Sequence, residues 1–359
     1  AYSNLDRSKY LNWSGGYFPA NRLTVGRIAN PNLAWEKNDA FNLALDYGLW
    51  DGRVRGSLDV YSANTTDLLL NKKLPVLTGF NEITTNVGNL KNTGFDLSVN
   101  TMNVDNNDFT WTTSFNVSYN KNEIVSLTGE EVEMTDADGN TYMAEPDDFD
   151  NGWFIGQNKD VIWNFEMGDV YTTDEAAEAA EWGLKPGDFR IIDQNNDGVL
   201  NTDDKVFQGL SKNPWYLTLR NDFTYKNFDM GIVFLSKLGY NAGSSLPFNE
   251  DQTYIKNHNW WASIDYWMPD NQLSDFARIN SNRLNSDMRI YVPKDYLRLQ
   301  NLSIGYNLPS DLLESVKISR ARVAFNADNV LVLTKWYEGD PESNVEMPRT
   351  FSFSVDFSF

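Results

Sequence analysis

The last nine residues of the chain alternate strictly between apolar and polar side chains and end on an aromatic residue. The apolar positions are Phe351, Phe353, Val355, Phe357 and Phe359, with serine or aspartate between them. Because successive side chains of a β-strand point to opposite faces, one face here is wholly apolar. A soluble β-sandwich rarely ends on an uncovered aromatic side chain, whereas the last strand of a membrane barrel presents its apolar face to lipid. The ending therefore predicts a barrel-closing strand.

The same alternation recurs along the chain and predicts about ten antiparallel strands that follow one another in sequence. Asp51-Gly52 and Lys226-Asn227 lie between alternating runs, and such short polar pairs favour tight hairpin turns. The alternation changes phase near Gln300, which a β-bulge would explain. The runs cover residues 41–49, 54–60, 95–100, 111–119, 215–225, 228–234, 296–308, 323–328 and 351–359.

The connections between these runs differ greatly in length. Tight turns alternate with long segments at residues 70–85, 128–159, 172–211 and 239–288. Short turns on one side and long loops on the other are typical of outer-membrane barrels. A β-sandwich, which we keep as the alternative fold, would distribute loop lengths more evenly and use Greek-key crossings.

Composition excludes several classes of protein. The formal charge of −20 and the isoelectric point of about 4.4 argue against binding to nucleic acid, whose phosphates would be repelled. The chain has no cysteine, so disulfides and thiol chemistry are excluded. It also has no run of ~20 apolar residues that would predict a membrane-spanning helix, although strands of alternating polarity escape this criterion.

One acidic stretch matches a twelve-residue calcium-binding loop. Calcium prefers six to eight oxygen ligands, which such a loop supplies from positions 1, 3, 5, 7, 9 and 12. Gly198 occupies the position of the sharp turn, but the last position holds aspartate where the motif prefers glutamate. The predicted ligands are Asp193, Asn195, Asp197, the Val199 carbonyl, Asn201 and Asp204.

We expect a bound calcium ion to stiffen the 172–211 loop and to take no part in catalysis. The flanking residues resemble short strands instead of the two helices of a regulatory EF-hand. The alternative interpretation is a solvated acidic turn that binds no metal.

Residues that could support catalysis are scarce, and we predict that the chain is not an enzyme. His258 is the only histidine, so the sequence offers neither a His-based triad nor a zinc cluster. The 239–288 segment, which we expect to be an extracellular loop, carries a cluster of aromatic residues. These residues, Trp260, Trp261, Tyr266 and Trp267, could contact a ligand or a partner, or could pack the core of the loop itself.

Four segments together resemble the C-terminal part of SusC-like, TonB-dependent outer-membrane transporters. The first comprises residues 30–37, 59–61 and 65–69, and the second residues 86–97. The third runs from Lys185-Pro186-Gly187-Asp188 into the calcium-type loop. The fourth comprises residues 295–309, 326–329 and 348–351. They span residues 30–359 in the order of the family, which makes the combination specific.

The resemblance implies a 22-stranded barrel with an N-terminal plug, in the outer membrane of a Gram-negative bacterium of the Bacteroidetes type. It also implies energy supplied by TonB, a SusD-like surface lipoprotein as a lid, and import of oligosaccharides or peptides. We expect residues 1–359 to form roughly the C-terminal half of that barrel. The plug and the region that meets TonB would then lie outside this sequence.

Two other functions remain open from the residues alone. A secreted, calcium-dependent lectin or adhesin that binds glycans would explain the tryptophans and the acidity. It would not explain the apolar strand faces. A glycan-cleaving enzyme has no supporting motif.

Overall fold

The computed structural model describes residues 2–11, 17–27, 30–74, 76–78, 82–135, 139–248, 265–313 and 318–358. The chain forms two compact units. One contains residues 1–43, 60–94 and 121–159, and the other residues 44–59, 95–120 and 160–359. Four strands (β3, β4, β7 and β8) pass from one unit into the other.

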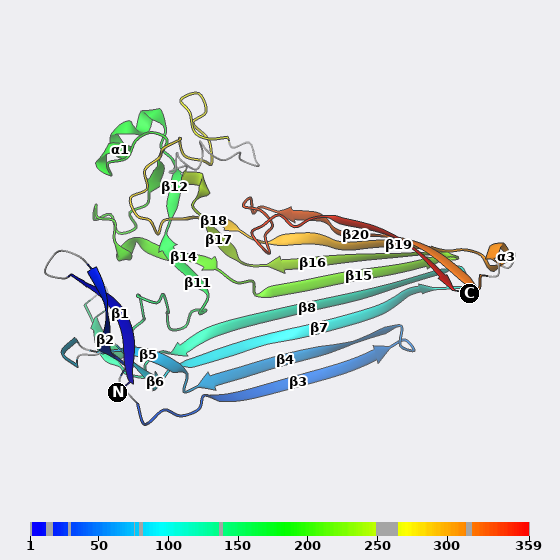
Figure 1. The fold of residues 1–359 in the computed structure, drawn as a ribbon, viewed down its shortest axis with the longest axis horizontal. Helices are drawn as coiled ribbons and strands as arrows, with labels where there is room; N and C mark the ends of the chain where they lie inside the picture. Colours follow the sequence, from blue (N-terminus) through cyan, green and yellow to red (C-terminus); the bar gives the residue numbers. More distant parts are fainter. Residues whose placement is uncertain are drawn as a thin grey trace. The chain divides into compact units, whose positions relative to one another are not determined.

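A nine-stranded sheet, most of which belongs to the larger unit, has its strands in the order of the sequence (Figure 1). Every pairing described in register, from β8 to β21, is antiparallel. The predicted antiparallel meander is therefore confirmed. Its strands are β3 (Lys37–Leu49), β4 (Val54–Thr66), β7 (Asn89–Asp105), β8 (Phe109–Ser126), β15 (Trp215–Tyr225), β16 (Phe228–Leu238), β19 (Tyr296–Asn307), β20 (Arg320–Thr334) and β21 (Thr350–Ser358).

Two local predictions about these strands are confirmed. Trp50, Asp51 and Gly52 all have positive φ, as a tight turn between β3 and β4 requires. Between β16 and β19 the register shifts so that Val233 faces Asn301 and Phe234 faces Leu299, which leaves Gln300 without a partner. This bulge puts Arg298 and Ser303 on the same face of the sheet, although residues five positions apart in a regular strand face opposite sides.

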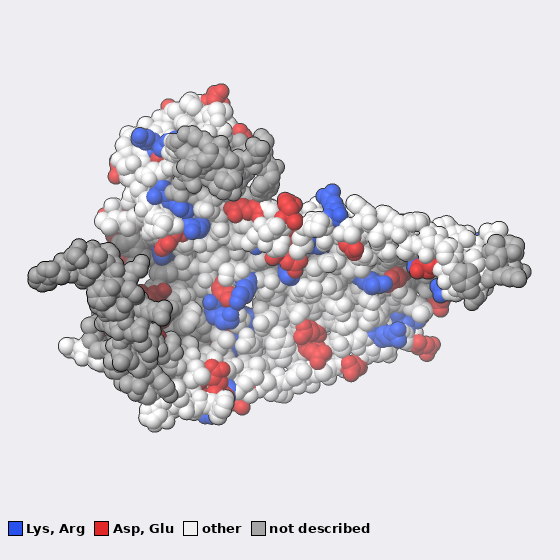
Figure 2. Space-filling view, in the orientation of Figure 1, with Lys and Arg blue, Asp and Glu red and all other residues white. Residues whose placement is uncertain are grey.

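The two faces of the sheet differ in chemistry. One carries apolar side chains with large exposed areas, among them Phe41, Phe353 and Phe357. The other carries paired charges, such as Arg220 with Asp222 (2.7 Å) and Arg322 with Asp229 (2.6 Å). In the view of Figure 2, basic and acidic groups adjoin one another over the strands and do not gather into a field of one sign.

Short strand pairs occupy the long connections. In the larger unit they are β11 (Val161–Phe165) with β14 (Lys205–Leu210), β12 (Met167–Val170) with β13 (Phe189–Ile191), and β17 (Asn241–Ser244) with β18 (Ile290–Pro293). The smaller unit holds β1 (Tyr2–Leu11) with β2 (Tyr17–Arg27), β5 (Leu69–Lys73) with β6 (Glu82–Asn86), and β9 (Val132–Thr135) with β10 (Thr141–Ala144).

The helices of the described residues are short. They are α1 (Ala176–Glu181) and α3 (Ser310–Leu313), with single 3₁₀ turns at Val76–Thr78, Thr173–Glu175, Thr202–Asp204 and Leu246–Phe248. Ion pairs of Glu175 and Glu178 with Arg190 hold α1 against β13. No helix in the described part of the chain is long and apolar enough to cross a membrane.

Candidate functional site

The long connections of the larger unit pack a hydrophobic core of their own. Residues that follow β8 along the chain meet residues that follow β16, and the rings of Phe189 and Phe248 lie 5.0 Å apart. The core therefore joins two loops that are distant in sequence. It consists of Phe165, Val170, Tyr171, Ala179, Leu184, Phe189, Ile191, Phe248, Trp267, Ala277 and Met288.

A buried ion pair ties the same two loops together. Asp188 is fully buried and pairs with Arg278 at 2.9 Å. Its carboxylate also accepts the backbone N–H groups of Lys185 (2.9 Å) and Asn282 (3.1 Å). Gly187, with φ of +89°, comes so close that an added Cβ would lie 2.6 Å from the Trp267 ring. The Lys185–Asp188 part of the third segment is thus the joint between the loops.

The structure describes two of the four aromatic candidates of the 239–288 loop, and these two differ in burial. Trp267 is 8 % exposed and belongs to the loop core, as the packing interpretation of the cluster predicted for it. Tyr266 is half-buried beside it. Trp260 and Trp261 lie outside the described residues. A contact with a ligand or partner therefore stays a prediction for Tyr266. Trp267 is too deeply buried for its ring to contact a ligand or partner over a large area.

The predicted calcium loop begins directly after β13 and ends in the Thr202–Asp204 turn. Positive φ at Asn196 and Gly198 curls the backbone around the acidic side chains. Asp193 accepts the N–H of Gly198 (2.8 Å), and Asp197 accepts that of Val199 (2.7 Å). The hydrogen bond from Gly198 is the main cause that lowers the pKa of Asp193, so this exposed carboxylate stays ionised.

The remaining predicted ligands close the loop. Asp204 is fully buried, and its two oxygens accept the N–H groups of Gln194 (3.0 Å) and Asn201 (2.8 Å). Asn201 in turn caps the final turn through the N–H of Asp203 (2.7 Å). A carboxylate oxygen that accepts one N–H keeps a second lone pair, so the donor set still suits calcium.

Carboxylates alone do not form a metal cluster. Within the described ranges, no three His, Asp or Glu side chains gather closely enough to hold an ion by themselves. The predicted set relies in addition on two asparagine side chains and one carbonyl. Calcium binding therefore stays a prediction.

The predicted closing strand, β21, exposes its whole apolar face. Phe351, Phe353 and Phe357 are 61 %, 68 % and 56 % exposed. β21 pairs with β20 in a register that sets Phe353 opposite Phe325, while Phe359 lies outside the described residues. A pairing of β21 with a further strand stays a prediction.

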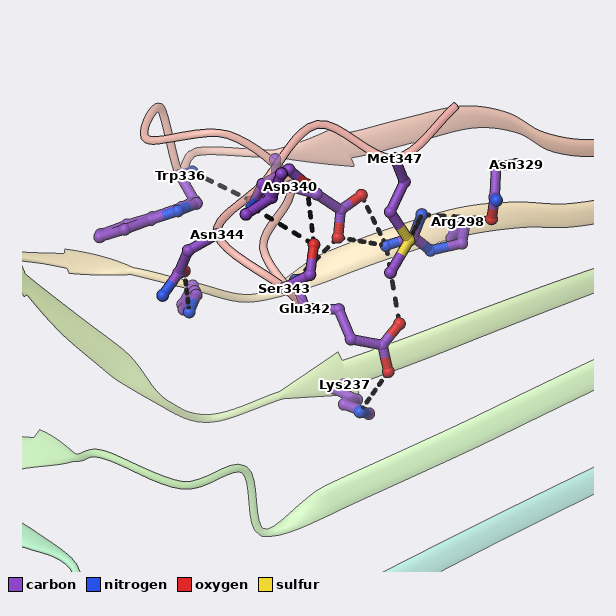
Figure 3. Close-up of polar contacts among 12 residues, drawn as sticks. Lys237, Arg298, Asn329, Trp336, Asp340, Glu342, Ser343, Asn344 and Met347 are labelled. Atoms are coloured by element: carbon purple, nitrogen blue, oxygen red, sulfur yellow. Dashed lines mark hydrogen bonds and ion pairs between the residues drawn. The ribbon is translucent and has the colours of Figure 1, made fainter. Parts of the chain in front are cut away.

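One cluster of charges was not predicted. Arg298, at the loop end of β19, is 1 % exposed and pairs with Asp340, which is 7 % exposed (Figure 3). One guanidinium nitrogen lies 2.7 and 2.9 Å from the two carboxylate oxygens of Asp340. Burial raises the pKa of Asp340, but the Arg298 guanidinium and the backbone N–H groups of Glu342 and Ser343 together outweigh burial, and the net pKa lies below the usual value.

The neighbours of this pair are charged as well. Glu342 contacts Lys237 of β16 at 2.6 Å and Arg298 at 3.7 Å (Figure 3). Lys294 donates to Asn344 at 2.6 Å and lies 5.1 Å from the Trp336 ring. Arg298 occupies a polar-face position of β19, so nothing in the local sequence marked it as buried. Its partner Asp340 lies 42 residues further along the chain and could not be identified from the sequence.

Known proteins resemble this chain in sequence. No family model matches it. It is 31% identical over 331 residues to TonB-dependent receptor P3 of Formosa agariphila, a match that covers 90% of this chain and 32% of the relative. It is 27% identical over 337 residues to TonB-dependent receptor SusC of Bacteroides thetaiotaomicron, covering 92% of this chain and 32% of SusC. The chain thus spans about a third of the length of these relatives.

The fold resembles solved transporter structures. The RagAB peptide transporter superposes with a TM-score of 0.68 at 23% identity, covering 100% of this chain and 38% of the RagAB chain. The fold is therefore the mainly β-stranded architecture of a TonB-dependent transporter barrel. The chain itself is a relative of the SusC-like TonB-dependent receptors, as its four segments predicted. The predicted location, the outer membrane of a Bacteroidetes-type bacterium, is confirmed by the same relatives.

Proposed function

We propose that the protein containing this chain imports oligosaccharides or peptides actively across the outer membrane. The observation that carries the proposal is the sheet with one exposed apolar face and one face of paired charges, in a fold shared with a peptide transporter. Apolar side chains half or more exposed are expected where the surrounding solvent is lipid. The charged face would line the lumen, and the relatives are named as receptors and not as enzymes.

The chain supplies roughly the C-terminal half of a 22-stranded barrel in this proposal. β21 would close the barrel against a strand outside this sequence, and a plug would fill the lumen. The long connections that carry the loop core would face the outside of the cell. The short turns at Trp50–Gly52 and Lys226-Asn227 would face the periplasm.

We propose a SusD-like lipoprotein and TonB as partners. The support is the relation to SusC and the structural likeness to RagAB, which is described as a peptide transporter. The likeness to RagAB supports peptides as cargo, and oligosaccharides remain the alternative that the resemblance to SusC-like transporters implies. The loops that pack the loop core would offer the surface on which such a lipoprotein rests.

Deletion of the gene tests this function. Cells that lack the protein should fail to grow on one oligosaccharide or peptide mixture as sole nutrient, and dissipation of the proton-motive force should stop uptake in the wild type. The full protein, extracted with detergent, should retain a surface lipoprotein. Recovery in the soluble fraction without detergent would contradict the proposal and favour the secreted glycan-binding lectin.

We also propose that residues 193–204 bind a structural calcium ion. Calorimetric titration of the chelator-treated protein should show binding to the wild type and none to Asp197→Ala. A ligand at 100 times its dissociation constant stabilises the folded state by about 2.7 kcal/mol. The matched control is Asp203→Ala, because Asp203 is acidic and adjacent but is not among the predicted ligands. Equal heats for all three proteins would exclude the site.

A further inference from the structure

Residues 335–349, which we call the strap, connect β20 to β21 and lie on the polar face of the sheet. The strap contacts Arg298, and the flanking Leu297 is 42 % exposed on the opposite, apolar face. The register pairs Leu235 with Arg298 and Lys237 with Tyr296, so Lys237 and Arg298 share the polar face. Asp340 and Glu342 of the strap reach these two cations (Figure 3).

Because both partners are buried, the ion pair between Arg298 and Asp340 should contribute most to holding the strap in place. The Arg298 side chain is 1 % exposed and that of Asp340 is 6 % exposed, so either charge without the other would remain in a site of low polarity. Arg298 also donates weakly to Asn329 at 3.4 Å and touches the sulfur of Met347 at 3.6 Å. Asp340, within the strap, and Met347, near its end, thus both contact one guanidinium.

The strap is also organised internally. Gly339 has φ of +76°, and an added Cβ would lie 2.8 Å from the carbonyl oxygen of Asn344. The N–H of Asn344 donates to the carbonyl of Asp340 at 2.8 Å, and that of Glu342 donates to its carboxylate at 2.9 Å. The tight turn therefore presents the Asp340 carboxylate to the strand below.

The strap touches the long loops as well. Glu338 accepts a hydrogen bond from Ser244 of β17, and the Tyr337 ring lies 5.8 Å from that of Phe276. From the end of β20, the strap passes over the loop end of β19 at Arg298 and reaches Lys237 of β16. Residues 342–346 remain exposed at its outer edge.

We infer that Arg298 is a positioning residue for transport. It holds the strap across the polar face of β16 and β19, and the strap narrows the passage that this face lines. The inference rests on the proposed function, because the polar face must be the lumen. The contacts themselves do not depend on it.

Limited proteolysis of the full protein in detergent tests whether Arg298 holds the strap. A glutamate-specific protease should cut at Glu342 and Glu346 at least ~10-fold faster in Arg298→Met, because cleavage requires a locally unfolded segment. The matched control is Arg322→Met, which removes an Arg–Asp pair elsewhere on the sheet and should leave strap cleavage unchanged. The reversed pair, Arg298→Asp with Asp340→Arg, should recover part of the protection.

Uptake of a bulky cargo tests the passage. In energised cells, Arg298→Met should take up a bulky fluorescent oligosaccharide faster than the wild type does, while Arg322→Met should not. Should Arg298→Met fail to reach the membrane, Glu342→Gln serves as a milder variant with a smaller effect in the same direction.

Two results would overturn the inference. One is equal strap cleavage in Arg298→Met and the wild type. The other is faster cleavage without faster entry, which would mean that the strap is held but narrows nothing. A wild type that transports no cargo would instead refute the proposed function, and the cleavage result would still decide whether Arg298 holds the strap.

Discussion

The strands and the loops of the larger unit treat large apolar side chains in opposite ways. In β21, Phe353 is 68 % exposed and Phe351 is 61 % exposed. In the loops, Trp267 is 8 % exposed and Phe248 is 1 % exposed. The loops thus fold as a water-soluble protein does, around a buried core, whereas the strands turn their apolar side chains outward. One chain is thus adapted to two solvents.

The largest effect is expected from Trp267→Ala. Removal of a buried tryptophan from the loop core should destabilise the loops by about 3–5 kcal/mol, because a cavity remains. Trypsin should then cleave residues 160–211 and 265–295 while the strands stay resistant. Tyr266→Ala, at the half-buried neighbour, is the control and should change little. Loss of protection in the strands as well would show that loops and sheet fold as one.

The next largest effect is expected from Phe353→Arg, which tests whether the apolar face of β21 meets lipid or water. Phe353→Arg should cost about 2–4 kcal/mol, if the side chain faces the middle of a bilayer. Ser354→Arg, one residue further on the polar face, should be nearly neutral. Urea unfolding in lipid vesicles measures both variants. Equal stabilities would mean that Phe353 faces water, and the contrast between strands and loops would disappear.

A smaller effect is expected at the joint between the loops. Gly187→Ala should destabilise them by about 1–3 kcal/mol, because the methyl group would overlap the Trp267 ring. Gly183 also has positive φ but has open space around it, so Gly183→Ala isolates the backbone strain alone. Thermal unfolding followed by tryptophan fluorescence compares the two. A loss no greater in Gly187→Ala would exclude tight packing at the joint.

The smallest effect concerns pH. The pKa of Asp340 lies below its ordinary value of 3.8, so its ion pair with Arg298 stabilises the folded strap above that pH. The stabilisation is lost as the pH falls through the lowered pKa. Hydrogen exchange at residues 342–346, corrected for intrinsic rates, should be constant from pH 7 to 5 and faster near pH 3. Asp340→Asn should abolish that dependence, and a change already at pH 5 would contradict the assignment.

The strands were predictable because their information is local. Alternation of period two located β7, β8, β15 and β21, the Asp51-Gly52 pair located a turn, and the phase change located the bulge at Gln300. The starts of β3 and β20 were placed several residues too late. Polar residues such as Asn38 and Arg320 belong to strands without contributing to an apolar face.

The candidate sites were less predictable because their partners are distant in sequence. Asp188 meets Arg278 across 90 residues, and Arg298 meets Asp340 across 42. No local pattern couples such residues. The calcium-type loop is the exception, since its six predicted ligands lie within twelve residues, and its curled backbone follows from Asn196 and Gly198.

The unpaired Gln300 is a β-bulge that changes which residues of β19 face the charged side of the sheet. Before it, even-numbered residues such as Arg298 face the charged side; after it, odd-numbered residues such as Ser303 do. If Gln300 were paired as an ordinary strand residue, half of the strand would turn over, so that either the Arg298 guanidinium faced lipid or Leu302 and Ile304 faced water. The bulge is therefore as much a part of the specification of this strand as its chemistry.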